Sequence, residues 1–197
     1  MQTKTLSKRE QADFAKEAEL LHGDCRAFRK RDNFDFFLYL VIVLLVAFSV
    51  RLFIFEPVRV SGASMETTLW DGERMFVEKV SLWFTEPERG EIVICRYPND
   101  PRNIVKRIVA MPGETVEIRW GVLYVNGKPL DESAYWEGPI QGNYGPAVVP
   151  EGHVFVMGDN RLVSLDSRSA GVGPIPFERI IGRVHYVILP FNAIRKV

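Results

Sequence analysis

The chain has few of the residues that build disulfide frameworks or metal centres. Its 197 residues include only two cysteines and three histidines. Two cysteines cannot form a disulfide framework. The histidines do not occur in a His-Glu-x-x-His motif, and no Cys-x-x-Cys spacing is present. We therefore expect no structural disulfide, no metal site and no cofactor.

The chain also lacks an excess of charge of either sign. Lys plus Arg and Asp plus Glu both total 25, so the formal net charge is zero. No basic stripe with interleaved aromatic residues is present, and we expect no nucleic-acid partner. The length allows one domain of ordinary size and an appendage.

What the sequence does contain is a long uncharged segment near its N-terminus. Residues 36–50 carry no charge, and after Arg51 the apolar character continues to Phe55. As a helix rising about 1.5 Å per residue, residues 36–55 would cross about 30 Å of hydrocarbon. The run exceeds the apolar region of a cleaved signal peptide. It predicts one transmembrane signal-anchor helix in the lipid bilayer.

The charges on either side of this segment predict its orientation. A basic cluster at residues 26–31 precedes the run, whereas only Arg51 and Arg59 follow closely. Because positive charge stays on the cytoplasmic side, residues 1–35 are expected to form a cytoplasmic polar tail and residues 56–197 an extracytoplasmic domain. Cys25 and Cys95 would then lie on opposite sides of the membrane.

Residues 56–197 show the pattern of a mainly β domain. Short runs rich in Val, Ile and aromatic residues alternate with Gly and Pro turns. These runs predict an antiparallel, partly closed β-barrel-like architecture, with a hairpin near residues 120–127. Residues 132–150, with several glycines and prolines, are expected to form a long surface excursion. The predicted strands are 75–80, 91–97, 103–110, 115–120, 122–125, 153–157 and 181–189.

Ser64 has the surroundings of a nucleophile. It follows Ser61, Gly62 and Ala63, whose small side chains let a substrate backbone approach, and Gly62 has dihedral freedom. A serine hydroxyl needs an activating base. No Gly-x-Ser-x-Gly elbow is present, and no histidine sits in a recognisable catalytic motif.

Lys106 is the candidate base. In a strand over 103–109 it shares a face with Ile104 and Ile108, and desolvation among apolar side chains lowers a lysine pKa. A drop of about 3 units from roughly 10.4 would make the amine a usable base at neutral pH. Arg107 cannot take this role because guanidinium stays charged. An edge-strand lysine that snorkels to water is the alternative.

A third segment, residues 157–168, reads Met-Gly-Asp-Asn-Arg-Leu-Val-Ser-Leu-Asp-Ser-Arg. Two carboxylates, two arginines and two serines after a β run indicate a tightly hydrogen-bonded loop. Ser164 or Ser167 is placed to orient a neutral lysine.

Together these segments resemble the bacterial type I signal peptidases, which are membrane-bound Ser–Lys proteases. The resemblance is carried by Ser61-Gly62-Ala63-Ser64-Met65 with Thr68-Leu69, by Arg89-Gly90-Glu91-Ile92-Val93, by Lys106-Arg107-Ile108-Val109 with Pro112-Gly113-Glu114, and by Gly158-Asp159-Asn160-Arg161 with Ser164, Asp166, Ser167 and Arg168. The compact length and single span resemble the shorter, Gram-positive type.

The resemblance implies a function and a set of roles. The protein would be anchored in the bacterial plasma membrane, with its active site on the outer face. It would remove signal peptides from secreted preproteins by cutting after small residues in an Ala-x-Ala pattern. By the same resemblance, Ser64 is the nucleophile, Lys106 is the general base and Ser164 positions the lysine. The resemblance also implies that Met65 forms part of the substrate pocket. The residues that it implies stabilise the loop are Asp159, Asp166 and Arg168.

The sequence departs from the family pattern at a few positions. Thr67 stands where the family usually has proline, and Glu91 and Glu114 stand where it has aspartate. Some members use a serine as oxyanion donor where this chain has Gly62, so we assign no side chain to that role. Two other functions stay open: a self-cleaving repressor-type Ser–Lys protease, and a catalytically silent, membrane-anchored binding or assembly module.

Overall fold

A computed structural model describes residues 8–53, 55–98 and 102–197 of the chain. The chain divides into two compact units, Met1–Val50 and Arg51–Val197. The sequence predicts domain boundaries after residues 35 and 55, and these remain predictions.

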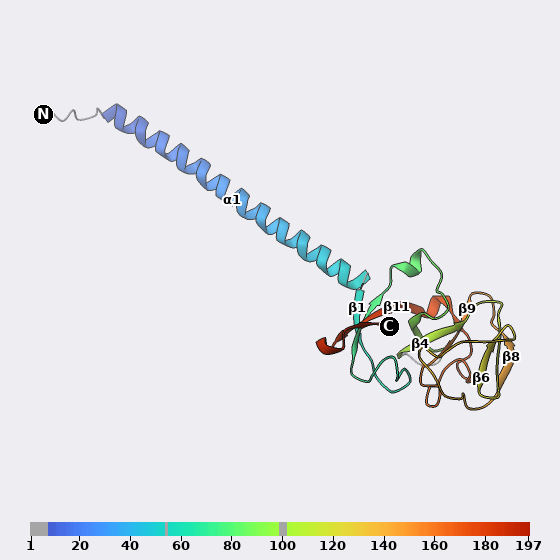
Figure 1. Cartoon of the computed structure of the whole chain (residues 1–197). Coiled ribbons are helices and arrows are strands. Elements are labelled where there is room, and N and C mark those ends of the chain that lie inside the picture. Colours follow the sequence, from blue (N-terminus) through green and yellow to red (C-terminus); the bar gives the residue numbers. More distant parts are fainter. Residues whose placement is uncertain (1–7, 54, 99–101) are drawn as a thin grey trace. The chain divides into compact units, whose positions relative to one another are not determined.

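The first unit is dominated by one helix. Helix α1, Lys8–Phe53, continues without a break from the polar segment into the apolar run (Figure 1). Large apolar side chains between Phe36 and Phe48 are exposed along it. Over the part of the chain that the structure describes, no helix reaches the combined length and apolarity needed to cross a membrane. Residue 54, inside the predicted span 36–55, lies outside the described residues.

The second unit consists of two antiparallel sheets (Figure 1). The larger has the order β1-β2-β11-β3-β4-β9-β10, and β12 pairs with β11. Its strands are β1 (Phe55–Arg59), β2 (Arg74–Glu78), β3 (Ile92–Arg96), β4 (Asn103–Ala110), β9 (His153–Met157), β10 (Ile175–Pro176), β11 (Ile180–Leu189) and β12 (Arg195–Lys196).

The smaller sheet has the order β7-β6-β5-β8. Its strands are β5 (Thr115–Arg119), β6 (Val122–Val125), β7 (Lys128–Pro129) and β8 (Tyr144–Val148), and short 3-10 turns lie at Ser81–Trp83, Phe177–Arg179 and Phe191–Ala193. The mainly β, antiparallel class is therefore confirmed. The larger sheet begins at β1 and ends at β10, so its hydrogen bonds do not close it into a barrel among the described residues.

Local sequence explains the predicted hairpin. Trp120 and Gly121 join β5 to β6 with φ values of 51° and 76°, and Asn126 and Gly127 join β6 to β7 with 52° and 74°. Two central residues of positive φ make the tight turn that matches strand twist, and Asn-Gly favours it. The hairpin prediction over residues 120–127 is confirmed.

Residues 132–150 lie mostly at the surface, as expected, but the segment also contributes to the smaller sheet and to the core. Its second half contains β8, which pairs with β5, and its first half buries Glu132 and Ile140. The alternation of apolar and polar residues that would predict a strand is missing there, because Gly145 and Pro146 lie within β8. Strand β1 begins at Phe55, inside the predicted apolar run.

Strand β4 is covered on both faces. Ile108 belongs to one buried cluster with Val93 and Val156, whereas Val109 belongs to another with Val116 and Phe155. The predicted alternation therefore holds. It also means that two successive charged residues, at positions 106 and 107, enter the protein interior on opposite sides of the strand.

Candidate active site

Residues 61–70 form the turn that presents Ser64, and we call them the nucleophile turn. It connects β1 to β2, with Leu69 N–H donating to the Met65 carbonyl at 2.8 Å. The Met65 and Leu69 side chains are buried in the core and anchor it. Gly62 has a φ of +94°, a region that glycine adopts without steric cost. Ser64 is thus held at the start of a fixed turn.

Lys106 reaches this serine from β4. Its Nζ lies 2.7 Å from Ser64 Oγ and 2.9 Å from the Val105 carbonyl oxygen. The lysine is only 3% exposed, so the alternative of a lysine that snorkels to water is wrong. Burial lowers the lysine pKa below its ordinary value, and the carboxylates of Asp166 and Asp159 oppose that shift only in part.

Asp159 holds the nucleophile turn against β4. Its carboxylate is fully buried and accepts hydrogen bonds from Arg107 Nε at 2.8 Å and Nη2 at 2.7 Å. The hydroxyl of Thr68, in the nucleophile turn, donates to the same carboxylate at 2.5 Å. A bidentate guanidinium–carboxylate pair fixes orientation as well as distance. The nucleophile turn and the lysine strand are therefore tied through one buried anion.

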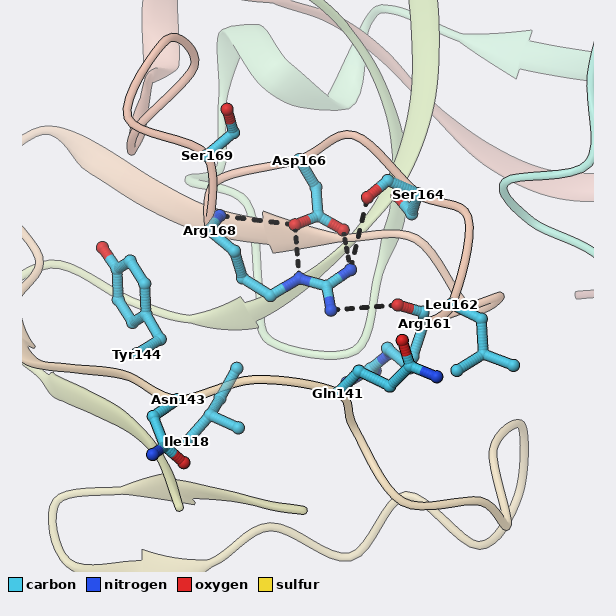
Figure 2. A pocket seen from close by; sticks show the side chains of 10 residues that line it. All are labelled: Ile118, Gln141, Asn143, Tyr144, Arg161, Leu162, Ser164, Asp166, Arg168 and Ser169. Atoms are coloured by element: carbon cyan, nitrogen blue, oxygen red, sulfur yellow. Dashed lines mark hydrogen bonds and ion pairs between the residues drawn. The ribbon is translucent and has the colours of Figure 1, made fainter. Parts of the chain in front are cut away.

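Asp166 and Arg168 form a second pair within the 157–168 loop. Figure 2 shows the two side chains facing each other at the wall of a cavity, with Arg168 Nε 2.7 Å and Nη2 2.8 Å from the carboxylate oxygens. Asp166 also accepts from the Gly158 N–H at 3.1 Å, and Arg168 donates to the Arg161 carbonyl at 3.0 Å. These hydrogen bonds within the loop hold its backbone in one conformation.

Ser164 lies close to Ser64, but no hydrogen bond joins it to Lys106 among the described residues. Its hydroxyl is buried without a partner there. A Cβ on Gly158 would overlap both the Ser164 hydroxyl and the Ser64 carbonyl oxygen, so only glycine allows this close packing. Ser167 instead accepts from the Val156 N–H at 3.0 Å. Of the two serines, only Ser164 has a free hydroxyl beside the dyad.

A small cavity with mixed polar and apolar walls adjoins Ser64 and Lys106. It has a volume of about 90 Å³ and lies between the end of β1, the nucleophile turn and the start of β4. Its walls include Val60, Ser64, Met65, Ile94, Val105 and Lys106.

The family profile described as "Signal peptidase, peptidase S26" matches residues 33–189. The chain belongs to this family. A signal peptidase I of Bacillus licheniformis is 41% identical over 179 residues, which cover 85% of this chain and 95% of that protein. Signal peptidase I T of Bacillus subtilis is 43% identical over 166 residues, which cover 80% and 86%. A solved signal peptidase I from Enterococcus faecalis is 32% identical, covers 50% of this chain and 97% of its own, and has a TM-score of 0.41.

Membership in the signal peptidase family makes this chain a serine endopeptidase that removes signal peptides. The structure brings Ser64, Met65 and Lys106 together, with Ser164 beside them. Asp159 and Asp166 contact the same assembly through Thr68 and Gly158.

Sequence reasoning missed the partners of these loop residues. Arg107 pairs with Asp159, and Arg161 pairs with Glu132 at 2.6 Å. The Tyr135 ring lies 4.2 Å from the Arg107 guanidinium carbon, where burial raises the tyrosine pKa to about 12. The segment near residue 135 thereby covers the ion pair. The motifs contain Arg107, Asp159 and Arg161 but do not indicate the pairing, because the partners are far apart in sequence.

Proposed function

We propose that this signal peptidase cleaves by a Ser–Lys mechanism, with Ser64 as nucleophile and Lys106 as general base. The observation that carries the proposal is the 2.7 Å contact between Lys106 Nζ and Ser64 Oγ, made by a buried lysine of lowered pKa. A neutral amine at this distance is a competent proton acceptor for a hydroxyl.

The reaction is acyl transfer. Lys106 takes the Ser64 proton while Ser64 Oγ bonds to the scissile carbonyl carbon, and the lysine then protonates the amine that leaves as the C–N bond breaks. A water next loses a proton to Lys106 and attacks the acyl-enzyme, which releases Ser64. The N–H of Ser64 donates to no acceptor among the described residues and supplies an oxyanion donor.

Other residues position this pair. The buried hydroxyl of Ser164 has no hydrogen-bond partner among the described residues and is available to orient the neutral lysine. Asp159 fixes the nucleophile turn through Thr68, and Asp166 with Arg168 keeps the loop in shape around Ser164. None of these three charged residues takes a proton in the reaction.

The substrate lies extended along this cavity, as a strand added beside β1 and β4. The small volume of the cavity supports a requirement for small residues before the cut, in the Ala-x-Ala pattern. Met65 forms part of the wall that the residue before the scissile bond contacts. Larger residues there would collide with the buried wall.

The protein works as a single-pass enzyme of the bacterial plasma membrane. The uncharged run of residues 36–50, the basic cluster before it and the exposed apolar side chains of α1 support this topology. The N-terminus is cytoplasmic and the dyad acts on the outer face. In intact cells, an external protease should digest the domain after residue 56 and spare a tag at residue 1; the reverse result would contradict the orientation.

The mechanism is tested by cleavage of a preprotein with an Ala-x-Ala site by the full chain in detergent. Ser64→Ala and Lys106→Ala should abolish cleavage while Ser133→Ala and Lys128→Ala, at exposed positions, leave it unchanged. Full activity of Lys106→Ala would remove the lysine from the mechanism. A folded wild type that cuts no preprotein but cuts itself would favour the repressor-type protease, and one that cuts nothing would favour the silent module.

A further inference from the structure

The guanidinium of Arg195, in the last strand of the chain, contacts the nucleophile turn. Arg195, in β12, donates from Nη2 to the Thr68 carbonyl oxygen at 2.6 Å. Its Nη1 and Nη2 also donate to the two carboxylate oxygens of Glu73, at 2.7 and 2.8 Å. Arg195 is separated from Thr68 by 127 positions in the sequence and from Glu73 by 122.

Glu73 is built into the base of the same turn. It is only 6% exposed, and one of its carboxylate oxygens accepts from the Trp70 N–H at 3.0 Å. The hydrogen bond from Arg195 lowers the pKa of this carboxyl below its ordinary value. The pair therefore stays ionised at neutral pH, and both charges meet at the end of the nucleophile turn.

Thr68 is hydrogen-bonded both to Arg195 of this pair and to Asp159. Its carbonyl accepts from Arg195 and its hydroxyl donates to Asp159, while its N–H donates to the Met65 carbonyl at 3.0 Å. A displacement of Thr68 thus passes directly into Met65, the residue after Ser64. Misplacement of a reacting group by about 1 Å is enough to lower a rate by about a hundredfold.

We infer that Arg195, with Glu73, is a positioning residue that acts through Thr68 on the Ser64 hydroxyl. Its planar fork donates to four acceptor oxygens, namely both Glu73 carboxylate oxygens and the carbonyls of Thr68 and Ala193, whereas a lysine ammonium has only three N–H donors. Arg195 does not line the substrate cavity, so its effect falls on turnover and not on substrate binding. The inference rests on the proposed role of Ser64 as nucleophile.

A purely structural role would make a different prediction. If Arg195 only fastens the C-terminal strand, its loss lowers thermal stability but leaves turnover per folded molecule unchanged. The side chain of Arg195 is 34% exposed, so a small cation from solution can reach its place. Chemical rescue therefore separates the two roles.

The experiment measures preprotein cleavage by full-length Arg195→Ala in detergent, well below its melting temperature. We expect kcat to fall between tenfold and about a hundredfold with KM within twofold, and methylguanidine, but not methylamine, to restore part of it. The control is the neighbouring exposed Lys196→Ala, which should match wild type. A folded Arg195→Ala with wild-type kcat, or a loss that methylguanidine does not restore, would overturn the inference.

Two further measurements keep the test decisive. If Arg195→Ala does not fold, Glu73→Gln is used, because it keeps an acceptor for Trp70 and weakens only the Arg195 pair; wild-type kcat in that variant overturns the inference. Labelling of the wild type by a serine-reactive phosphonate reports the nucleophile separately. Absence of label from Ser64 contradicts the proposed mechanism, whereas equal labelling rates in wild type and a folded Arg195→Ala contradict the positioning role alone.

Discussion

Asp159→Asn is expected to lower both the stability and the activity of the protein. The substitution keeps the shape of the side chain but removes the charge that compensates Arg107. The Asp159 carboxylate is fully buried and its partner nearly so. The remaining guanidinium would be left in the interior beside neutral groups, which include the Gly90 carbonyl, the Thr68 hydroxyl and the Tyr135 ring.

The size of the effect follows from burial. Removal of one partner of a buried ion pair costs about 3–5 kcal/mol, because the other charge stays desolvated and unpaired. Asparagine keeps one acceptor oxygen, so the lower end of this range, about 3 kcal/mol, is expected. For a domain of this size that corresponds to a drop in melting temperature of roughly 6–12 °C.

The assay is thermal unfolding of the full chain in detergent, followed by tryptophan fluorescence, with preprotein cleavage measured in parallel. Asp131→Asn, at an exposed position, serves as the control. Its melting temperature should lie within about 2 °C of wild type, because surface substitutions usually change stability little. The double variant Arg107→Met with Asp159→Leu should be more stable than the sum of its single variants predicts. A melting temperature of Asp159→Asn within about 2 °C of wild type would refute the reasoning.

Three further outcomes follow from the same site. Because burial lowers the Lys106 pKa, kcat/KM should rise with pH and level off below 10.5, the ordinary value; a midpoint at or above it would exclude a desolvated base. The same shift means that the unfolded state binds more protons than the folded state between the folded-state pKa of Lys106 and 10.5, so the stability of the protein should rise with pH across that window. Lys106→Met should therefore melt a few degrees higher than wild type at neutral pH. A lower melting temperature of this variant would contradict the argument. Gly158→Ala should reduce cleavage at least tenfold and lower stability by about 1–3 kcal/mol, because the new Cβ would displace the Ser64 carbonyl. Cleavage at the wild-type rate would show that the loop can move to accommodate the Cβ. The buried Cys95 thiol, whose pKa burial raises to about 12, should resist iodoacetamide at pH 8 in a Cys25→Ser background until the protein unfolds; rapid alkylation of the native protein would contradict its burial.

The structure shows how one strand holds two neighbouring cationic side chains in different environments. Strand β4 carries Lys106 toward one buried cluster and Arg107 toward the other face, so neighbouring cations have separate environments. Arg107 meets a buried carboxylate and stays charged, while Lys106 meets a hydroxyl and apolar side chains. The same strand thereby holds both a structural ion pair and a buried amine whose pKa is lowered.

Some features of this protein are determined by the sequence alone. The strand over 103–110, the hairpin at Gly121 and Gly127, and the shared face of Ile104, Lys106 and Ile108 follow from side-chain alternation and turn residues. These are short-range properties of the backbone, and each residue carries its own preference. The motifs at Ser64 and Lys106 could be found in the same way, because each is contiguous in sequence.

Only the tertiary structure decided which charged residues meet. The loop at 157–168 contains both Asp159 and Arg161, yet each pairs outside the loop, with Arg107 and Glu132. Likewise, nothing near Arg195 in the sequence indicates that it reaches the turn of the nucleophile. The tertiary fold brings these partners together, and burial makes the pairs of Arg107 and Arg161 obligatory, because an unpaired charge in the interior is too costly to keep.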